Sequence, residues 1–239
     1  MVEGVKQLQI NNIIQPFKYC IHLEKDELKP SFDLGILDRL HLPNQENRKV
    51  WRSFCANFVD TDLWQDPAYD RHGHVGFAWG AKRAVLDKIR LYDRALIGGA
   101  DHIIAHAAAG QINHSCIAKS FTDNLDEIEA WSREFHSIIQ GKIGCVKGGL
   151  YHLWHGDIAK RDYLRRIQKF TPLSRNILRR DRNGLFETDD VAVVEYMEDY
   201  FDRREVTEKH PDSTEDKNIC EQIVNINTRE ADRCFENFS

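Results

Sequence analysis

Apolar residues recur three or four positions apart in five segments of the chain, and this spacing predicts amphipathic helices. The clearest case is the segment in which Leu125, Ile128 and Phe135 share one helical face. The five predicted helices are Ala81–Ile89, Asp101–Ala109, Thr122–Ile139, Asp157–Phe170 and Asp189–Arg203.

Two other segments favour extended structure. Asn12–Leu23 predicts one or two short strands interrupted at Pro16, because proline has no N–H to donate to a neighbouring strand. Ile143–Trp154 predicts a strand pair or one bent strand, in which Gly148 and Gly149 permit a sharp change of direction. The expected fold is therefore mixed α/β: a small, largely antiparallel or mixed sheet with helices around it.

The 239 residues, of which 41% are hydrophobic, are enough for one sizeable domain. Polar and charged residues dominate after Glu205, so we expect a domain at 1–204 and a flexible tail at 205–239. The formal net charge of −5 does not favour nucleic-acid binding, which needs a basic surface to neutralise phosphates.

Cysteine spacing and hydropathy suggest the compartment. The six cysteines include no close pair, so the sequence indicates neither a zinc ribbon nor a dense disulfide framework. No run approaches the ~18 consecutive apolar residues of a membrane span, and the N-terminus lacks the pattern of a secretory signal. We expect a soluble, cytoplasmic protein without a membrane span.

Candidate chemistry begins where Gly98 and Gly99 lead into an acid, Asp101, at a predicted helix start. Glycines let the backbone turn sharply and leave room for a ligand, and the partial positive charge of a helix N-terminus stabilises a carboxylate. An ionised, accessible carboxylate can accept a proton from a hydroxyl that becomes a nucleophile, which is general-base catalysis. The alternative is that Asp101 only caps its helix.

His102 and His106 are four positions apart in the same predicted helix. They share one helical face, a spacing that can bind zinc or another transition metal. The stretch HIIAH lacks the glutamate of the HExxH zinc proteases, because Ile103 takes that position. One pair also leaves a metal short of ligands, so ordinary, partly buried histidines are the alternative.

Two further segments offer metal-ligand candidates. Asp60 and Asp62 flank Thr61 after an apolar stretch, and two acids at a strand end can hold Mg²⁺ or Mn²⁺ while nucleotide phosphates complete the shell. His152 and His155 follow a predicted strand and precede an arginine-rich helix, which can bring an imidazole to a divalent ion and cations to a phosphate. Asp-x-Asp triplets are common by chance, so their surroundings decide their value.

Three segments, taken in order, resemble the C-terminal half of a glycosyltransferase with the GT-A fold, of the family 2 or family 7 type. They are HVGFAWGAKRAVLDKI, RLYDRALIGGADHII and GGLYHLWHGDIAKRDYLRR. Such enzymes have a Gly-aromatic segment ending in Arg, matched here by Gly76–Arg83, and a Gly-Gly-x-acid loop, matched by Gly98–Asp101. A metal-binding histidine follows a later strand. The resemblance extends from about Ile13 to Arg204.

The resemblance implies a function. The chain would transfer a sugar from a nucleotide-sugar donor to a glycan or other hydroxyl acceptor, with Asp101 as the catalytic base and inversion at the anomeric carbon. Mn²⁺ or Mg²⁺, held by His152 or His155, would neutralise the departing nucleotide diphosphate. The residues implied for substrate binding are Trp79, Gly98, Gly99, Arg161 and Arg165.

The chain departs from this family at its N-terminal side. The strands and helices that bind the nucleotide in a complete GT-A enzyme have no counterpart, and NIIQPF resembles the segment that follows their Asp-x-Asp motif. We therefore expect a partial GT-A-like fold that needs a separate donor-binding chain, or that self-associates through an exposed sheet edge. An incomplete product and a remnant without turnover are the alternatives.

Two other functions remain open from the sequence. A non-catalytic carbohydrate-binding or assembly module would use the aromatic-rich segment Trp51–Trp79 to bind glycan without turnover. A zinc-dependent hydrolase would use His102, His106, His114 and the histidines of HLWH. No acidic general base occupies a motif position between those histidines.

Overall fold

The computed structural model of the chain describes residues 2–25, 27, 50–68, 71–95, 98–121, 124–154 and 178–208, with side chains described to residue 202. The predicted helix Asp157–Phe170 and the predicted site residues His155, Arg161 and Arg165 lie outside these ranges. The chain divides into two compact units, Met1–Tyr196 and Met197–Ser239, and every described candidate site residue belongs to the first.

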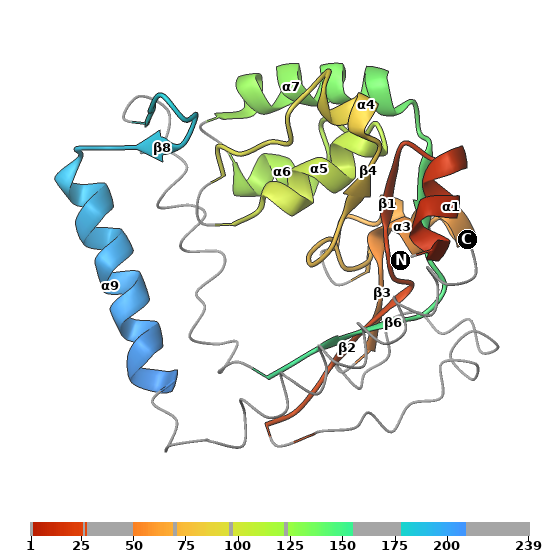
Figure 1. Cartoon of the computed structure of the whole chain (residues 1–239), viewed down its shortest axis with the longest axis horizontal. Coiled ribbons are helices and arrows are strands. Elements are labelled where there is room, and N and C mark those ends of the chain that lie inside the picture. Colours follow the sequence, from red (N-terminus) through yellow and green to blue (C-terminus); the bar gives the residue numbers. More distant parts are fainter. Residues whose placement is uncertain are drawn as a thin grey trace, which may run out of the picture. The chain divides into compact units, whose positions relative to one another are not determined.

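The described strands form two small mixed sheets and a hairpin, and helices flank the sheets (Figure 1). In the first sheet, β1 is antiparallel to β4 and parallel to β5; in the second, β2 is antiparallel to β3 and parallel to β6. The strand bounds are β1 Ile13–Gln15, β2 Tyr19–His22, β3 Val50–Arg52, β4 Gly80–Ala81, β5 Ile143–Cys145, β6 Gly149–His152, and the hairpin β7 Arg179–Arg180 with β8 Phe186–Glu187. The expected mixed α/β class with a small mixed sheet is confirmed.

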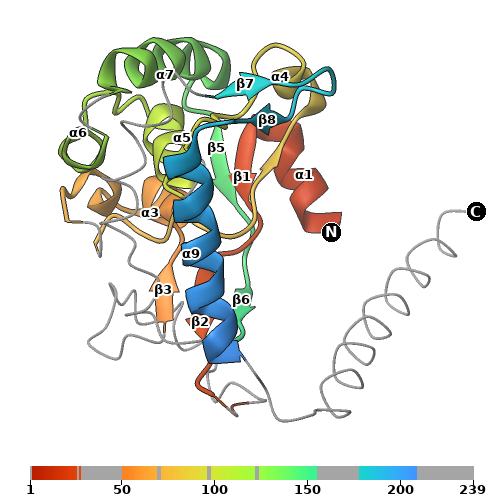
Figure 2. The same cartoon turned by 90° about the vertical axis from the view of Figure 1, so that its left-hand side faces the viewer.

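The two sheets are joined by a bent pair of parallel chain segments (Figure 2). β1 continues past Pro16 into β2, and β5 continues past Gly148 into β6. Between the strands, the Lys18 backbone N–H still donates to the Gly148 carbonyl at 2.9 Å. The interruption at Pro16 and the bent strand at Ile143–Trp154 are therefore as predicted.

The described helices are α1 Val2–Ile10, α3 Phe54–Asp60, the 3-10 helix η1 Leu63–Gln65, α4 Arg83–Leu86, α5 Ala100–Ala108, α6 Ser115–Ser120, α7 Leu125–Ile139 and α9 Val191–Glu208. The two helices predicted at Asp101–Ala109 and Thr122–Ile139 are present: α5 begins and ends one residue earlier than predicted, and α7 begins at Leu125 and ends at Ile139. Helices α1, α3 and α6 were not predicted. The predicted helix Ala81–Ile89 is wrong in extent, because the backbone of Ala81 pairs with Ile13 in the sheet and leaves only α4.

The end of the described chain differs slightly from prediction. The final helix is capped by Asp190, not Asp189: Asp190 Oδ1 accepts the backbone N–H of Ala192 at 3.0 Å. The helix runs to Glu208, past the domain boundary predicted at residue 204. No described helix combines the length and the apolar composition needed to cross a bilayer.

The main core is formed by α5 and α7 packing together against the β1–β5 sheet (Figure 1). α7 begins at Leu125 with acids in its first turn, and it turns Ile128, Phe135 and Ile139 inward. α5 turns Ile103 and Ile104 toward the same core, so burial of apolar area on both helices stabilises their contact. This packing fixes the start of α5, where the candidate chemistry lies.

Candidate functional site

α5 begins with the two glycines that the sequence singled out. Gly98 and Gly99 have φ of 117° and 92°, values that favour glycine, and Gly99 occupies the N-cap position. Asp101 follows in the first turn, and its Oδ1 accepts the backbone N–H of His102 at 2.9 Å. The predicted glycine turn and acid-bearing helix start are thus present.

Behind Asp101, α5 buries its two histidines. His102 and His106 are 6% and 1% exposed, and they meet two side chains from other segments. His72 comes from the loop before the bridge between Ser53 and His74, and Cys116 comes from α6. We call this set, His72, His102, His106 and Cys116, the buried cluster.

The four ligand atoms of the buried cluster converge on one point. All lie within 4.8 Å of one another. Nε2 of His102 is 3.1 Å from Nε2 of His72 and 3.1 Å from Sγ of Cys116, and Nε2 of His106 is 3.3 Å from the same sulfur. In a tetrahedral zinc site with ordinary bond lengths, nitrogen ligands lie roughly 3.3 Å apart. The spacing is therefore close to that of a metal shell.

The other nitrogen of two of these rings faces an acceptor. Nδ1 of His72 lies 2.9 Å from the Gly73 carbonyl, and Nδ1 of His106 lies 2.7 Å from Oε1 of Gln111. Since a carbonyl oxygen only accepts, each Nδ1 carries the proton, and Nε2 turns a lone pair toward the centre. This is the tautomer that binds a metal through Nε2.

Burial keeps these imidazoles neutral. Burial, with repulsion from neighbouring imidazoles, lowers the pKa of His72 to about 4, of His102 to about 3 and of His106 to about 2. Burial also raises the pKa of the Cys116 thiol to about 12. Without a cation the cluster is uncharged at neutral pH, and a metal would be needed to hold Cys116 as a thiolate.

A fourth imidazole borders the buried cluster. His114, the N-cap of α6, stacks on His106 with ring centroids 4.2 Å apart, and its Nδ1 lies 2.7 Å from the Cys116 sulfur. His114 therefore contacts the sulfur from outside the four-atom group. In the alternative of a zinc-dependent hydrolase, the sequence proposed His114 together with His102 and His106.

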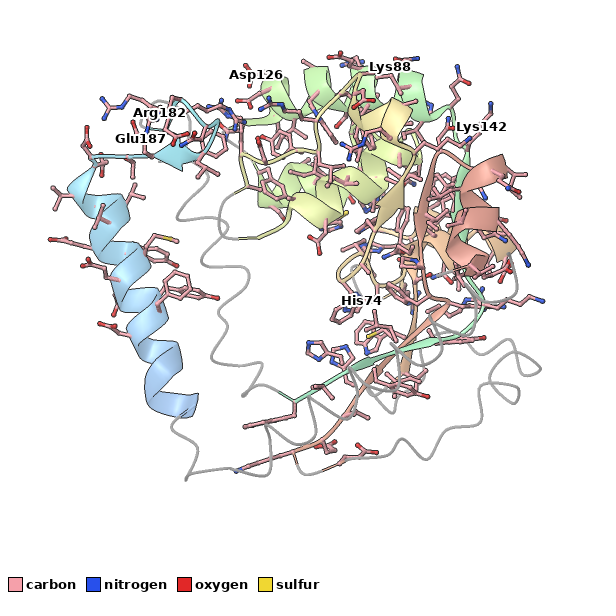
Figure 3. All side chains as sticks on the ribbon, in the orientation of Figure 1. His74, Lys88, Asp126, Lys142, Arg182 and Glu187 are labelled. Carbon is pink, nitrogen blue, oxygen red and sulfur yellow. The ribbon has the colours of Figure 1, made fainter. Side chains whose placement is uncertain are left out.

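A second group lies on the other side of the His72–His74 loop. Cys20, His22 and His74 place ligand atoms within 4.8 Å of one another. His152, on β6, pairs with His22 on β2, and their ring centroids are 4.6 Å apart. We call Cys20, His22, His74 and His152 the strand cluster; Figure 3 labels His74, near β2 and β6.

The strand cluster differs in its hydrogen bonds. Nδ1 of His74 accepts the backbone N–H of Gly76 at 3.1 Å. Burial, with repulsion from His22 and His152, lowers the pKa of His74 to about 3, so the ring is neutral. A neutral imidazole whose Nδ1 accepts carries its proton on Nε2, and that nitrogen has no lone pair for a metal. His74 is therefore not prepared as a metal ligand.

Asp101 lies against the strand cluster. A Cβ added at Gly76 would lie 3.1 Å from Oδ2 of Asp101 and 3.0 Å from Cε1 of His74, so glycine lets both side chains approach the backbone closely. Phe77 follows with φ of 73°, a strained value for an aromatic residue, and its ring stacks on His74 at 4.5 Å and contacts His152 at 4.9 Å.

The predicted acids Asp60 and Asp62 lie elsewhere. The sequence predicted Asp60 at the end of a strand, but it ends helix α3. Its Oδ2 is 2.6 Å from Arg52 and 3.2 Å from Lys18. Burial acts to raise the pKa of Asp60, but hydrogen bonds and attraction from Arg52 and Lys18 outweigh it and lower the pKa. Among the described residues, neither acid belongs to a group that can share an ion.

The described donors near Asp101 do not fit the metal that the resemblance implies. Mg²⁺ and Mn²⁺ prefer carboxylate, carbonyl and water oxygens. The groups around His152 are the imidazoles of His22 and His74 and the Cys20 thiol, whose pKa burial raises to about 12. A role for His152 with Mn²⁺ or Mg²⁺ stays a prediction.

Trp79 packs in two directions. It is half-buried and packs both against the main core and against a second apolar group formed by Phe54, Val75 and Ala105. Its indole N–H donates to the Val75 carbonyl at 2.9 Å. These contacts hold the segment that carries Gly76 and Phe77. Its predicted role in substrate binding stays a prediction.

Comparisons with known proteins identify no relative. No family model matches the chain, and no significant match is found among curated proteins or among solved structures. Function is therefore inferred from the chain's own residues.

The sequence signalled part of this arrangement. The i, i+4 pair of α5 was identified, whereas His72 and Cys116 were not proposed as ligands. Two short patterns mark them: RHGH contains His72 and His74 two residues apart, and HSC contains His114 and Cys116. In each pattern the two side chains serve different positions, which only the folded chain reveals.

Proposed function

We propose that this chain forms the acceptor side of a glycosyltransferase-type site, in which Asp101 is the general base for sugar transfer to a glycan hydroxyl. The observation that carries the proposal is the meeting of three distant segments at one place. Asp101 from the Gly-Gly loop lies against Gly76, Phe77 stacks on His74, and His152 contacts Phe77. These are the three segments that resemble glycosyltransferase motifs.

The proposed step uses Asp101 alone. Its carboxylate, at the positively polarised start of α5, accepts the proton of the acceptor hydroxyl. The oxygen then attacks the anomeric carbon of the donor, and the nucleotide diphosphate leaves with the electron pair of the broken bond, which inverts the anomeric centre. Since the described donors do not fit Mg²⁺ or Mn²⁺, no step is assigned to a metal.

Phe77 fits the role of a sugar platform. Its side chain is 38% exposed, although it stacks on His74, and its backbone is held at positive φ. Strained residues of this kind concentrate at functional sites, and an exposed aromatic face suits the apolar face of a sugar ring. We expect Phe77→Ala to weaken acceptor binding more than it weakens stability.

The experiment is a transfer assay with UDP- and GDP-sugars and a panel of glycan acceptors. Asp101→Asn should reduce transfer by about 10²- to 10⁴-fold, the usual contribution of a general base, and leave the thermal midpoint unchanged. The matched control is Asp126→Asn, the same change in the first turn of α7 (Figure 3), which should transfer like the wild type.

Two outcomes would contradict the proposal. Undiminished transfer by Asp101→Asn would remove Asp101 from the chemistry. Glycan binding without transfer, together with no binding of UDP or GDP in calorimetric titrations, would instead assign a non-catalytic carbohydrate-binding module. A partner chain that restores transfer to the wild type but not to Asp101→Asn would support a divided enzyme.

A further inference from the structure

The buried cluster is the densest group of metal-ligating side chains in the part of the chain that the structure describes. Its four members come from three segments and are all nearly or fully buried: His72 at 0%, His102 at 6%, His106 at 1% and Cys116 at 9% exposure. Burying polar side chains costs free energy unless hydrogen bonds or a metal ion compensate for the lost water. Its position does not depend on any assumption about sugar transfer.

Hydrogen bonds alone explain the cluster only in pairs. A proton on Nε2 of His102 can be donated to Nε2 of His72, and the Cys116 thiol can donate to His106. Two separate bonds do not require four ligand atoms to converge within 4.8 Å of one another. One central cation requires this convergence and replaces both protons.

The donor set selects the cation. Three imidazoles and one thiolate are borderline-soft ligands that suit zinc and not Mg²⁺ or Ca²⁺. The ring nitrogens turned away from the centre donate to Gly73 and Gln111, as the histidine ligands of zinc commonly do. Because four protein groups fill a tetrahedral shell, no position is left for a reacting water, so the site is structural.

His114 completes the surroundings of the sulfur. Its Nδ1 lies 2.7 Å from Sγ of Cys116, while its Nε2 makes only a long contact of 3.4 Å with the Gln65 carbonyl. The same Nδ1 accepts the backbone N–H of Cys116 at 3.4 Å, as the N-cap of α6, so it presents a lone pair and not a proton to the sulfur. His114 therefore packs beside the site and is not counted among its four ligands.

We propose that His72, His102, His106 and Cys116 bind one Zn²⁺ in a closed tetrahedral site that ties the His72–His74 loop to α5 and α6. Two of the ligands are close in sequence to residues of the candidate active site. His102 directly follows Asp101, and one residue, Gly73, separates His72 from His74. The zinc thereby holds the start of α5 and the Gly76 turn in register. A single ion thus fixes the segments that carry Asp101 and His74, the two side chains that approach Gly76.

The first test is the metal content of the full chain, purified without chelator and dialysed. The wild type should retain about one zinc ion per chain, as a closed four-ligand site does. Cys116→Ser and His106→Ala should lose it. Cys55→Ser, at a fully buried cysteine outside the cluster, and His136→Asn, at a histidine bonded to the Ala108 carbonyl, should keep it.

Cobalt substitution of the wild type gives a readout that needs no variant. In the wild type, Co²⁺ should show the intense visible bands of tetrahedral coordination and a thiolate-to-cobalt charge-transfer band. Cys116→Ser should lose the charge-transfer band, whereas Cys20→Ser, in the strand cluster, should retain it. Gln111→Ala should weaken zinc binding about 10- to 100-fold, because it removes the partner of a ligating ring.

Three results would overturn the proposal. Wild-type chain that binds neither zinc nor cobalt would mean that protons alone hold the cluster. Full zinc content in Cys116→Ser would place the metal elsewhere, and loss of zinc in Cys20→Ser with retention in Cys116→Ser would place it in the strand cluster. None of these readouts involves sugar transfer, so the proposed function stands or falls separately.

Discussion

The buried cluster and the strand cluster are built from the same side chains, histidine and cysteine, and are joined through the three residues from His72 to His74. They differ in what the outer ring nitrogens contact. In the buried cluster, Nδ1 of His72 and of His106 donates to an oxygen, which turns an Nε2 lone pair inward. In the strand cluster, Nδ1 of His74 accepts from the Gly76 backbone, which leaves Nε2 protonated.

The difference shows that residue type and proximity are not sufficient to identify a metal site. Both groups place at least three ligand atoms within 4.8 Å of one another. Only the buried cluster combines four such atoms, near-complete burial and the tautomers that a cation requires. The strand cluster is better suited to line a polar site beside Asp101, where His74 and Phe77 stack.

The largest expected effect is that of metal removal. Free zinc at about 1,000 times its Kd would stabilise the folded chain by about 4 kcal/mol. For a chain of this length that corresponds to roughly 8–16 °C in the thermal midpoint. A strong chelator should lower the midpoint of the wild type by this amount and leave that of Cys116→Ser unchanged. Equal responses of the two proteins would contradict the comparison.

The next effect is at the turn between the clusters. Gly73 has φ of 101°, and a Cβ there would lie 2.8 Å from the Phe54 Cα and from the Ser53 carbonyl oxygen. Gly73→Ala should therefore cost about 1–3 kcal/mol of unfolding free energy and also weaken zinc binding, because His72 is displaced. Gly148→Ala is the matched control, since it has positive φ but no atom within 4 Å of its Cβ. Denaturant unfolding and zinc titration of both variants measure the contrast.

A smaller effect on stability is expected at Asp60, and the same variant tests whether its carboxylate oxygen binds the metal. Asp60→Asn should lower the unfolding free energy by about 1 kcal/mol, because it leaves the buried Arg52 with weaker partners, while water screens the partly exposed carboxylate. Metal content should not change. A loss of metal in this variant would mean that Asp60 is a metal ligand, as the sequence predicted.

The ion pairs of Asp60 with Arg52 and Lys18 predict a pH dependence of the unfolding free energy. The folded-state pKa of Asp60 is lowered, so the unfolded state binds the proton more readily. The stabilisation is fully present above the unfolded pKa of about 3.9 and is lost as pH falls through the lower folded pKa. The difference in unfolding free energy between wild type and Asp60→Asn should be constant above about pH 5 and shrink toward zero in stronger acid. A constant difference at all pH values would exclude the ion pairs as its source.

The smallest effect is expected at His74. His74→Asn keeps an acceptor for the Gly76 N–H, so the unfolding free energy should change by less than about 1 kcal/mol. Zinc content, measured by elemental analysis, should equal that of the wild type. Zinc loss would mean that the strand cluster binds metal despite its tautomer.

Local patterns predicted the elements that determine the candidate site. The Gly-Gly-x-acid turn indicated the start of α5, and the helical spacing of Ile128 and Phe135 indicated α7. The bend at Pro16 was likewise visible, because proline interrupts strand pairing. α3 was missed, although Ser53 caps it by accepting the Ala56 N–H, because dense aromatic residues hide its helical period.

The complete buried cluster was not predictable in this way. The spacing of His102 and His106 depends only on the helix, so the sequence indicated half of the ligands. His72 and Cys116 reach the same point through the packing of a loop and of α6 against α5, which no local spacing encodes. For the same reason Asp60 was assigned to a metal, although Arg52 and Lys18 occupy its carboxylate.

X-ray absorption at the zinc edge of the purified wild-type chain tests the central claim most directly. A shell of three nitrogen ligands at about 2.0–2.1 Å and one sulfur at about 2.3 Å is the predicted result, and the sulfur should disappear in Cys116→Ser reconstituted with zinc. A shell of oxygen and nitrogen without sulfur, or a sulfur that persists in Cys116→Ser, would contradict the assignment of the buried cluster as the metal site.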